Sequence, residues 1–398
     1  MQVPNSQSHS ASMPPMFVAS GWANLTINVV IEMVNRLPCA MDRARMTAVC
    51  QAWLAAIAHA QPLPFQLPSL LLPPADVTDV YCYLSGGCRD HSMLPGPRHF
   101  GSYDGGWIFF AYGQTSLHRM INIRTRERRA LPDMIEGLAA HGTPSMVILA
   151  ATLSFPPDHP KCVAAGIVTY KPHLLEAPRR RHFAFWCLGS KVATCDVAVP
   201  APVGLAWQQE DVVYYRDSFH FLTRGGHIIV CTPIVRDGVL LRVLSELMRF
   251  EQGGYNNQQF VRARYLVSSR GELLMVVRLA AHHRALTSSF KVFRMTVITR
   301  ARTWIEEVAL CGRMLFVGRG CSRSYEVSQY PGFKDGIFFL DDRSFYDVEM
   351  MFGRINERLY PCSDNGRWSP AEGLSRHVDL FFPERVPSLN SPPAWLLP

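Results

Sequence analysis

No apolar run in this 398-residue sequence approaches the roughly 20 residues that a membrane-spanning helix requires. The longest candidate, Met146 to Leu153, is short enough to be a buried strand. Residues 1–20 lack the basic start and apolar stretch of a signal peptide, and we read them as a disordered tail. We therefore expect no membrane partner.

Signatures of common catalytic sites are also missing. The sequence contains no G-x-S-x-G, G-x-x-x-x-G-K-[ST], G-x-G-x-x-G or H-E-x-x-H motif. None of the 11 cysteines forms a C-x-x-C pair, which argues against a zinc site, and the odd count favours reduced thiols. We expect a protein that is not an enzyme and that has no metal and no cofactor.

Two weaker candidates for ion binding remain. His282 and His283 are adjacent, and neighbouring residues on a strand point to opposite faces, so they cannot jointly hold one ion there. Asp341, Asp342 and Asp347 could supply oxygen ligands to a cation, but Asp also ends strands, and we favour that interpretation.

Positive charge is in excess, with a formal net charge of +8. Two basic clusters, Arg124 to Arg129 and Arg179 to Arg181, could meet an acidic partner, nucleic acid or an import receptor. Each cluster adjoins a strand pattern and neither belongs to a recognisable nucleic-acid module, so we favour solvated turns and expect no nucleic-acid partner.

The N-terminal region carries two apolar helical patterns separated by Leu37 and Pro38. Their spacing of three or four residues predicts one apolar side on each helix, and Asp42 is a credible start for the second. So short a hairpin cannot bury all these groups alone, and it either packs on the next domain or offers a face to a partner. The apolar residues are Leu25, Val29, Val30, Met33, Val34 and Leu37, then Met46, Val49, Cys50, Trp53, Leu54 and Ile57.

This region resembles the plant F-box, whose usual form reads W-x-x-L-P-x-x-L-L, then R-L-P, D-R-x-R and V-C-x-x-W. The resemblance implies a three-helix module that docks on the Skp-family adaptor of a cullin–RING ubiquitin ligase. One departure is Thr26, which stands where the family has proline, and it leaves open a module that recruits no ligase. The matching positions include Trp22, Asp42 and Arg43, and the residues expected to bind the adaptor are Leu25, Val29, Val30, Met33, Leu37, Arg45, Val49, Cys50 and Trp53.

The character of the chain changes after residue 60. Five prolines within residues 61–75 predict a stiff connector. Short stretches rich in β-branched and aromatic residues follow, punctuated by Gly, Asp or Arg, and they predict strands. Val239 to Phe250 is the main helix candidate in this part.

The segment from Tyr265 to Val308 reads as four consecutive strands with short turns. Four strands per roughly 40–50 residues is the period of a β-propeller blade, and about 300 residues would make six or seven blades. A pair of β-sandwiches is the alternative. A propeller closes by pairing strands from both ends, which removes exposed edges.

The same region resembles the F-box-associated KIB-type domain of plants, a propeller-like domain of unknown function. The similarity rests on Tyr265 to Arg278, Phe290 to Met295, Thr303 to Gly318, Gly336 to Asp347 and the ending Ser391 to Pro398. Together the two resemblances imply a mainly β protein with a small N-terminal α-helical module. Its domains would be a disordered tail (1–20), an F-box (21–60), a connector (61–75) and a KIB-type substrate-binding propeller (76–398).

The expected function is that of a substrate-recognition subunit of a Skp–cullin–F-box E3 ubiquitin ligase. The F-box would hold the Skp-family adaptor, and the propeller would present an unknown protein target, in the nucleus, the cytoplasm or both. The alternatives are a propeller binding module with a degenerate F-box and an enzyme with a site at the propeller mouth.

Overall fold

The computed structural model divides the chain into two compact units, residues 1–64 and 65–398. It describes Trp22 and residues 25–398 apart from 38, 61–65, 73–77, 83–86, 94–95, 137–143, 173–175, 196–203, 251–258, 299–300, 331, 355–356, 371–376 and 380–386. The tail expected over residues 1–20 lies outside the described residues.

The first unit contains three helices, α1 (Ile27–Asn35), α2 (Ala40–Thr47) and α3 (Gln51–His59). Thr26 precedes α1 with φ −65° and ψ 148°. Buried Arg43 donates from Nη1 to the carbonyl oxygen of Leu37 at 3.0 Å, which ties the end of the first helical region to α2. The core of the unit consists of Val30, Val34, Met46, Trp53, Ala56, Ile57 and Ala60.

The second apolar pattern does not form one continuous face. The chain turns at Ala48 and Val49, between α2 and α3, so the helical periodicity is interrupted there. As a result Val49 and Leu54 are half exposed, whereas Met46, Trp53 and Ile57 are buried. Val29 of the first pattern is also exposed.

The described residues of the second unit form six sheets, and the first sheet joins the two ends of the unit. The order is β26-β1-β2-β3. Leu71 pairs with Ala394 and Leu70 with Trp395 in antiparallel register. The prolines of residues 61–75 predicted a connector, but β1 lies within this segment. Leu70 to Leu72 are buried, and their burial stabilises β1 in the sheet. The strands are β1 (Ser69–Leu72), β2 (Thr78–Cys82), β3 (Gly87–Met93) and β26 (Ala394–Leu396).

The second and third sheets follow in chain order. The second is an antiparallel sheet of β4 (Arg98–Tyr103), β5 (Trp107–Ala111), β6 (His118–Asn122) and β7 (Arg128–Ala130). The third has the order β8-β12-β11-β10-β9, with β8 parallel to β12. Its strands are β8 (Met134–Glu136), β9 (Met146–Leu153), β10 (Val163–Tyr170), β11 (His182–Cys187) and β12 (Val192–Thr194). The apolar run at residues 146–153 is a buried strand, as expected.

The fourth and fifth sheets are simple antiparallel meanders. The fifth confirms the four-stranded unit expected between Tyr265 and Val308. The fourth contains, after the 3₁₀ turn η2 (Leu205–Trp207), β13 (Gln209–Tyr215), β14 (Ser218–Thr223), β15 (Ile228–Arg236) and β16 (Val239–Met248). The fifth contains β17 (Phe260–Ser269), β18 (Glu272–Ala280), β19 (Thr287–Ile298) and β20 (Ala301–Glu307).

The expected helix at Val239–Phe250 is wrong, because this segment is the strand β16. Asp237 and Gly238 both have positive φ, 52° and 76°, and they form a tight turn that folds β16 back onto β15. Pairing along the whole length of β15 outweighs the helical preference of the leucines in the segment.

The sixth sheet has the order β22-β21-β23-β24-β25. β21 and β23 are parallel, whereas the other neighbours are antiparallel. The strands are β21 (Arg313–Val317), β22 (Arg323–Glu326), β23 (Gly336–Phe339), β24 (Gly366–Ser369) and β25 (His377–Asp379), and the short helices are η3 (Val327–Gln329), η4 (Arg343–Tyr346) and α4 (Val348–Met351). Phe345 and Tyr346 lie in η4.

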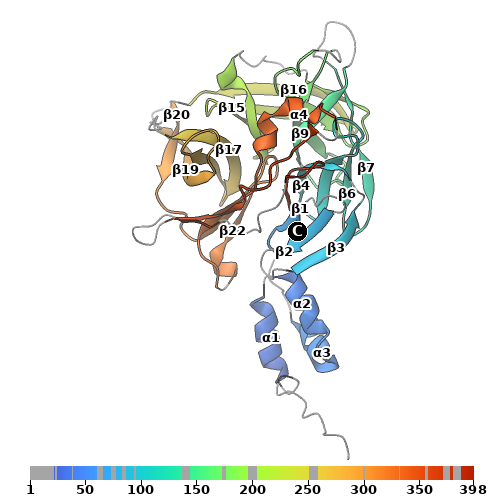
Figure 1. The fold of residues 1–398 in the computed structure, drawn as a ribbon, viewed down its shortest axis with the longest axis vertical. Helices are drawn as coiled ribbons and strands as arrows, with labels where there is room; N and C mark the ends of the chain where they lie inside the picture. Colours follow the sequence, from blue (N-terminus) through green and yellow to red (C-terminus); the bar gives the residue numbers. More distant parts are fainter. Residues whose placement is uncertain are drawn as a thin grey trace, which may run out of the picture. The chain divides into compact units, whose positions relative to one another are not determined.

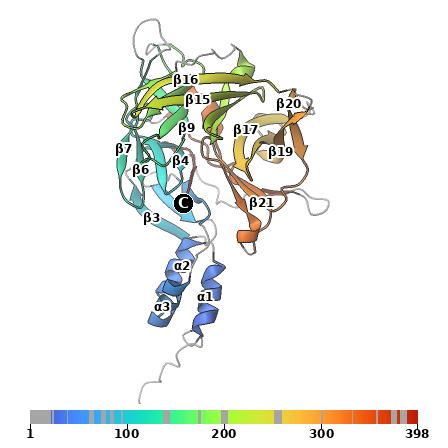
Figure 2. The ribbon, with the colours of Figure 1, turned by 180° about the vertical axis from the view of Figure 1, so that it is seen from behind.

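The six sheets form a closed cycle. β26 contacts β4, β4 contacts β9, β9 contacts β13, β13 contacts β17, and β17 contacts β21. Trp395 closes the circuit, because its indole Nε1 donates to the carbonyl oxygen of Val317 at 2.9 Å. Figures 1 and 2 show β19 and β20 on the opposite side of this unit from β6 and β7. The unit is therefore propeller-like, and strands from its two ends pair, since β26 pairs with β1.

No helix among the described residues has both the length and the apolar character to cross a membrane.

Candidate functional site

The residues predicted to bind an adaptor divide into two groups in the helical unit. Val30 and Trp53 are buried in its core, and Leu25, Met33, Leu37 and Cys50 are partly buried against that core. Val29, Arg45 and Val49 face solvent, and Val29 and Val49 are 43% and 50% exposed. The first group therefore shapes the unit, and the second is available to a partner.

Two exposed apolar residues extend the accessible group. Ile27 and Leu54 are each 52% exposed. The sequence pattern assigned Leu54 to the apolar helical side and did not single out Ile27. Exposed apolar side chains in a unit this small are available for contact with another protein.

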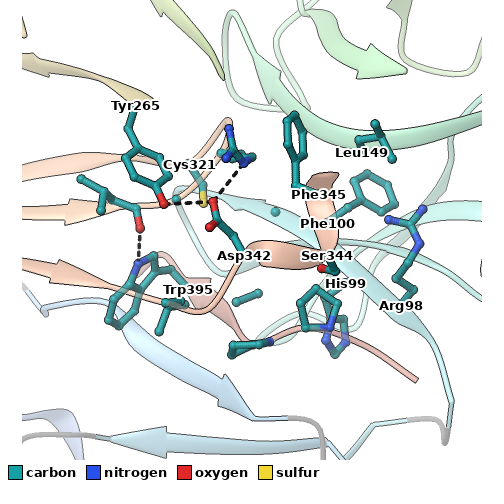
Figure 3. A pocket seen from close by; sticks show the side chains of 18 of the residues that line it. Arg98, His99, Phe100, Leu149, Tyr265, Cys321, Asp342, Ser344, Phe345 and Trp395 are labelled. Carbon is teal, nitrogen blue, oxygen red and sulfur yellow. Dashed lines mark hydrogen bonds and ion pairs between the residues drawn. The ribbon is translucent and has the colours of Figure 1, made fainter. Parts of the chain in front are cut away.

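A small cavity lies at the centre of the β unit, where the inner strands meet (Figure 3). Its volume is about 70 Å³, far below the roughly 300–1,000 Å³ of usual ligand pockets. Its lining comes from β4, β9, β17, the loops after β21 and β23, and the C-terminal segment. Such a space can hold a few water molecules.

The wall of this cavity is held by Arg319. Its Nε pairs with Asp342 Oδ2 at 2.9 Å, and its Nη2 donates to the Tyr346 hydroxyl at 2.9 Å. Its guanidinium carbon lies 3.8 Å from the centre of the Phe345 ring. Neighbouring acidic groups outweigh burial and raise the pKa of Arg319, so the charge is permanent.

Arg278 forms a second ionic connection between the fifth and sixth sheets. Its Nη2 lies 2.8 Å from Asp364 Oδ2, and its Nη1 donates to the Leu340 carbonyl oxygen at 2.6 Å. Tyr265 donates to Asp342 Oδ2 at 2.9 Å, and burial raises the pKa of that tyrosine well above its usual value. These satisfied pairs join neighbouring sheets and hold the ring in one arrangement.

His99 lies on the other side of the cavity in Figure 3, beside Arg98. It is buried, and neither ring nitrogen has a hydrogen-bond partner among the described residues. Burial, with a smaller contribution from Arg98, lowers the pKa of His99 to about 4, so the ring is neutral at pH 7.

The residues that the sequence offered as weaker candidates for ion binding have different roles in the structure. Asp341 binds Arg343, Asp342 binds Arg319 and Tyr265, and Asp347 accepts from the backbone N–H of Met350. Within the described part of the chain, no three His, Cys, Asp or Glu residues gather as a metal site would require. His282 and His283 are exposed in the turn after β18.

The two basic clusters also have different environments. Arg128 and Arg129 belong to β7, and Arg129 contacts Glu127 and Asp158. Arg179 and Arg180 are exposed, as expected for a turn, but Arg181 is buried with only 6% of its side chain accessible. This burial could not be predicted from the local sequence, because it depends on the distant residues Phe345 and Tyr346. Their rings lie 4.6 and 5.2 Å from the Arg181 guanidinium carbon.

Comparison with protein families decides the nature of the β unit. A family model described as KIB1-4 β-propeller matches residues 81–360. The chain belongs to the KIB1-4 β-propeller family. The match begins in β2 and ends just after α4, so it covers most of the six sheets. A comparison with curated proteins finds no match.

Two solved structures have a distant likeness to this chain. Dihydro-heme d1 dehydrogenase NirN, in complex with DHE, has a TM-score of 0.26 and 10% identity, covering 94% of this chain and 91% of that one. A mutant Trypanosoma rangeli sialidase with trans-sialidase activity has a TM-score of 0.21 and 9% identity, covering 67% of this chain and 44% of that one. Likenesses at this level carry no argument about the function of the KIB1-4 propeller.

Proposed function

We propose that this protein is the substrate-recognition subunit of a Skp–cullin–F-box E3 ubiquitin ligase of plants. The helical unit would act as an F-box that binds the Skp-family adaptor, and the KIB1-4 propeller would bind the protein to be ubiquitinated. The chain would catalyse no reaction and would act by bringing target lysines close to the charged ubiquitin carrier. It would work in the nucleus, the cytoplasm or both, without a membrane or nucleic-acid partner.

One observation carries this proposal. The three-helix unit buries Val30 and Trp53 in its own core and leaves Ile27, Val29, Val49 and Leu54 exposed. Several of these residues coincide with the F-box pattern, so the pattern accounts both for a folded module and for exposed apolar side chains that a partner would cover.

The geometry at Thr26 is compatible with the proline that the F-box family carries at this position. Its φ of −65° is the value to which proline is restricted. The side chain makes no capping hydrogen bond, so no such bond is lost on substitution. We therefore expect Thr26→Pro to preserve or strengthen adaptor binding.

We further propose that each of the six sheets corresponds to one propeller blade, within the expected six or seven. The support is that each sheet has four or five strands and that consecutive sheets contact each other around a closed cycle.

A quantitative pull-down with a purified Skp-family adaptor tests the ligase role. Val29→Glu should abolish capture, because it places a charge on the exposed apolar surface. Asn28→Glu is the matched control, since Asn28 is also exposed on α1 and is polar already. Neither change touches the core, so both proteins should keep their helical circular dichroism.

Leu25→Ala and Trp53→Ala should also abolish capture, in this case by disrupting or unfolding the module. Removing a large buried side chain such as Trp53 typically costs about 3–5 kcal/mol. Equal capture of the wild type and of folded Val29→Glu, Leu25→Ala and Trp53→Ala proteins would exclude the F-box role. The second candidate, a propeller binding module without a ligase, would then stand, and the absence of the F-box proline at Thr26 favours it.

A further inference from the structure

A second cavity, of about 310 Å³, lies between the third, fourth, fifth and sixth sheets. Its volume is within the usual range of ligand pockets. Five of its eleven lining residues are arginines, and only one is a carboxylate, Glu210. We call it the arginine cavity, and its arginines are Arg181, Arg224, Arg262, Arg264 and Arg343.

The arginines reach the cavity from different elements. Arg181 directly precedes β11, Arg224 follows β14, Arg262 and Arg264 lie on β17, and Arg343 lies in η4. They therefore surround the space instead of lining one side of it. Arg181 and Arg262 are 8% and 6% exposed, whereas Phe260 and Tyr346 are 38% and 36% exposed, so the cavity has a buried floor and an accessible rim.

Glu210 does not balance the positive charge of the arginine cavity, because its single carboxylate already contacts three residues. Its carboxylate lies 3.6 Å from Arg181 and 3.8 Å from Arg319, and it also accepts a hydrogen bond from the Tyr346 hydroxyl. Arg181 gains one further polar contact, from Nη2 to Gln208 Oε1 at 3.2 Å. Its Nε is buried and has no hydrogen-bond partner among the described residues.

The other carboxylates near the cavity are shared in the same way. Asp364 contacts both Arg262 and Arg278, and Asp341 is bound by Arg343. The Arg224 guanidinium makes no hydrogen bond or ion pair with another described residue. Leaving Arg264 aside, five arginines share four carboxylates, and Arg224 pairs with none of the described carboxylates. The five arginines are Arg181, Arg262, Arg278, Arg319 and Arg343, and the carboxylates are Glu210, Asp341, Asp342 and Asp364.

Arg181 and Arg262 are buried, and Arg224, Arg264 and Arg343 are partly buried. An excess of positive charge in such a site is destabilising unless an anion accompanies it. Consistent with this, burial lowers the pKa of Arg181, and the nearby charges of Arg319 and Arg224 contribute to that lowering. The planar guanidinium group matches phosphate and carboxylate oxygens in bidentate geometry. A concave site of one sign also concentrates counter-ions.

We propose that the arginine cavity binds a small molecule that carries several phosphate or carboxylate groups. A single phosphorylated side chain would engage only one side of the space, whereas a compact polyanion can contact arginines from several sheets at once. This proposal does not depend on the ligase role, because the cavity lies in the β unit and the adaptor is proposed to bind the helical unit. Its test therefore uses no adaptor.

The first experiment measures binding by the full-length protein, with tripolyphosphate and citrate as probes at constant ionic strength. At least one probe should bind with a dissociation constant below about 1 mM in calorimetry and should raise the unfolding temperature, because it binds only the folded state. The affinity should fall as sodium chloride is added. Failure of both probes to bind would overturn the proposal.

The second experiment locates the bound probe. Arg224→Gln should weaken binding about tenfold or more, the usual effect of losing a charge-assisted hydrogen bond. Arg242→Gln removes the same charge from an exposed position on the outer strand β16 of the same sheet, so it should leave binding unchanged. Equal affinities for the two variants would place the anion elsewhere and overturn the proposal.

A phosphoserine peptide provides the last comparison. The small polyanion should bind more tightly than the peptide. Arg224→Gln should reduce the affinity for the polyanion more than the affinity for the peptide. Binding of the peptide alone, with neither tripolyphosphate nor citrate retained, would overturn the small-molecule proposal and identify the cavity as a site for a phosphorylated protein.

Discussion

Five histidines of the β unit are held neutral by burial, which lowers the pKa of each. Both ring nitrogens of buried His118 have polar partners. Its Nδ1 lies 2.6 Å from Asp133, and its Nε2 accepts from the N–H of Ile148. His99 has no such partners. The five are His99, His118, His182, His220 and His227.

His99 should therefore make the protein sensitive to acid. Its pKa is about 4 in the folded protein and 6.5 in the unfolded chain, so between these values the unfolded chain binds the extra proton. The protonation of His99 therefore does not reduce the free energy of unfolding above pH 6.5. It reduces that free energy by about 3 kcal/mol as the pH drops to 4. In urea unfolding, His99→Leu should lose this part of the pH dependence, whereas exposed His283→Leu should keep it. Identical slopes for the wild type and His99→Leu would contradict this expectation.

Two glycines with the same backbone conformation differ in the space around them. Gly320 and Gly271 have φ of 72° and 74°. A Cβ on Gly320 would lie 2.4 Å from the backbone oxygen of Ala151, whereas a Cβ on Gly271 would meet nothing within 4 Å. The N–H of Gly320 also donates to buried Asp211 at 2.7 Å, so this backbone cannot move freely.

We expect Gly271→Ala to lower the free energy of unfolding by about 1 kcal/mol, the cost of a left-handed backbone for alanine. Gly320→Ala should cost at least about 3 kcal/mol, because the clash with the Ala151 backbone adds to that cost. Chemical denaturation of both variants measures the difference. Similar losses would mean that the Gly320 loop can move away from β9.

At the scale of elements, strands could be predicted where apolar and polar residues alternate and where turn residues such as glycine separate the alternating segments. The fifth sheet follows directly from Ser269, Arg270 and Gly271 and from the alternation on either side. The Asp237–Gly238 turn was an equally clear signal for β16, yet its leucines suggested a helix. The parallel pairing of β21 with β23 and the burial of Arg181 could not be predicted, because both depend on contacts between distant segments.

The residues proposed to bind the adaptor could be named from the sequence, but which of them are exposed could not. The F-box pattern includes core positions and exposed positions alike, and only the packing of the three helices separates Val30 and Trp53 from Val29 and Val49. The arginine cavity left no pattern in the sequence, since its residues come from four sheets.

The strand β26 should contribute to the stability of more than one sheet. Trp395 is 1% exposed, packs against Phe316 and donates to the Val317 carbonyl oxygen. We expect Trp395→Ala to lower the free energy of unfolding by about 3–5 kcal/mol. Trp207→Ala, at a half-buried position stacked on His227, should cost less than half as much. Comparable losses in urea unfolding would show that β26 is only loosely attached.

At the scale of the whole molecule, the division after Pro64 defines how the two units can be separated. A chain starting at residue 65 keeps β1, whereas one starting at residue 76 loses β1 and leaves β26 without its partner. The boundary at residue 76 that the prolines suggested would therefore damage the propeller.

Under the proposed function, residues 65–398 should retain the target but lose the adaptor. Affinity purification with the proteasome blocked should recover the same target with this chain and with the full-length protein, and the Skp-family adaptor only with the latter. Overproduction of residues 65–398 should slow degradation of the target. Loss of the target from a demonstrably folded 65–398 chain would mean that the helices take part in recognition and would favour the non-ligase module.

The pairing of β1 with β26 also determines when the protein can finish folding. During synthesis, β1 leaves the ribosome before the strands of the other five sheets, and its partner β26 emerges only after them. In the meantime the unpaired edge of β1 is open to other strands, a state prone to aggregation. Chaperone demand should therefore persist until β26 has been translated and has paired with β1.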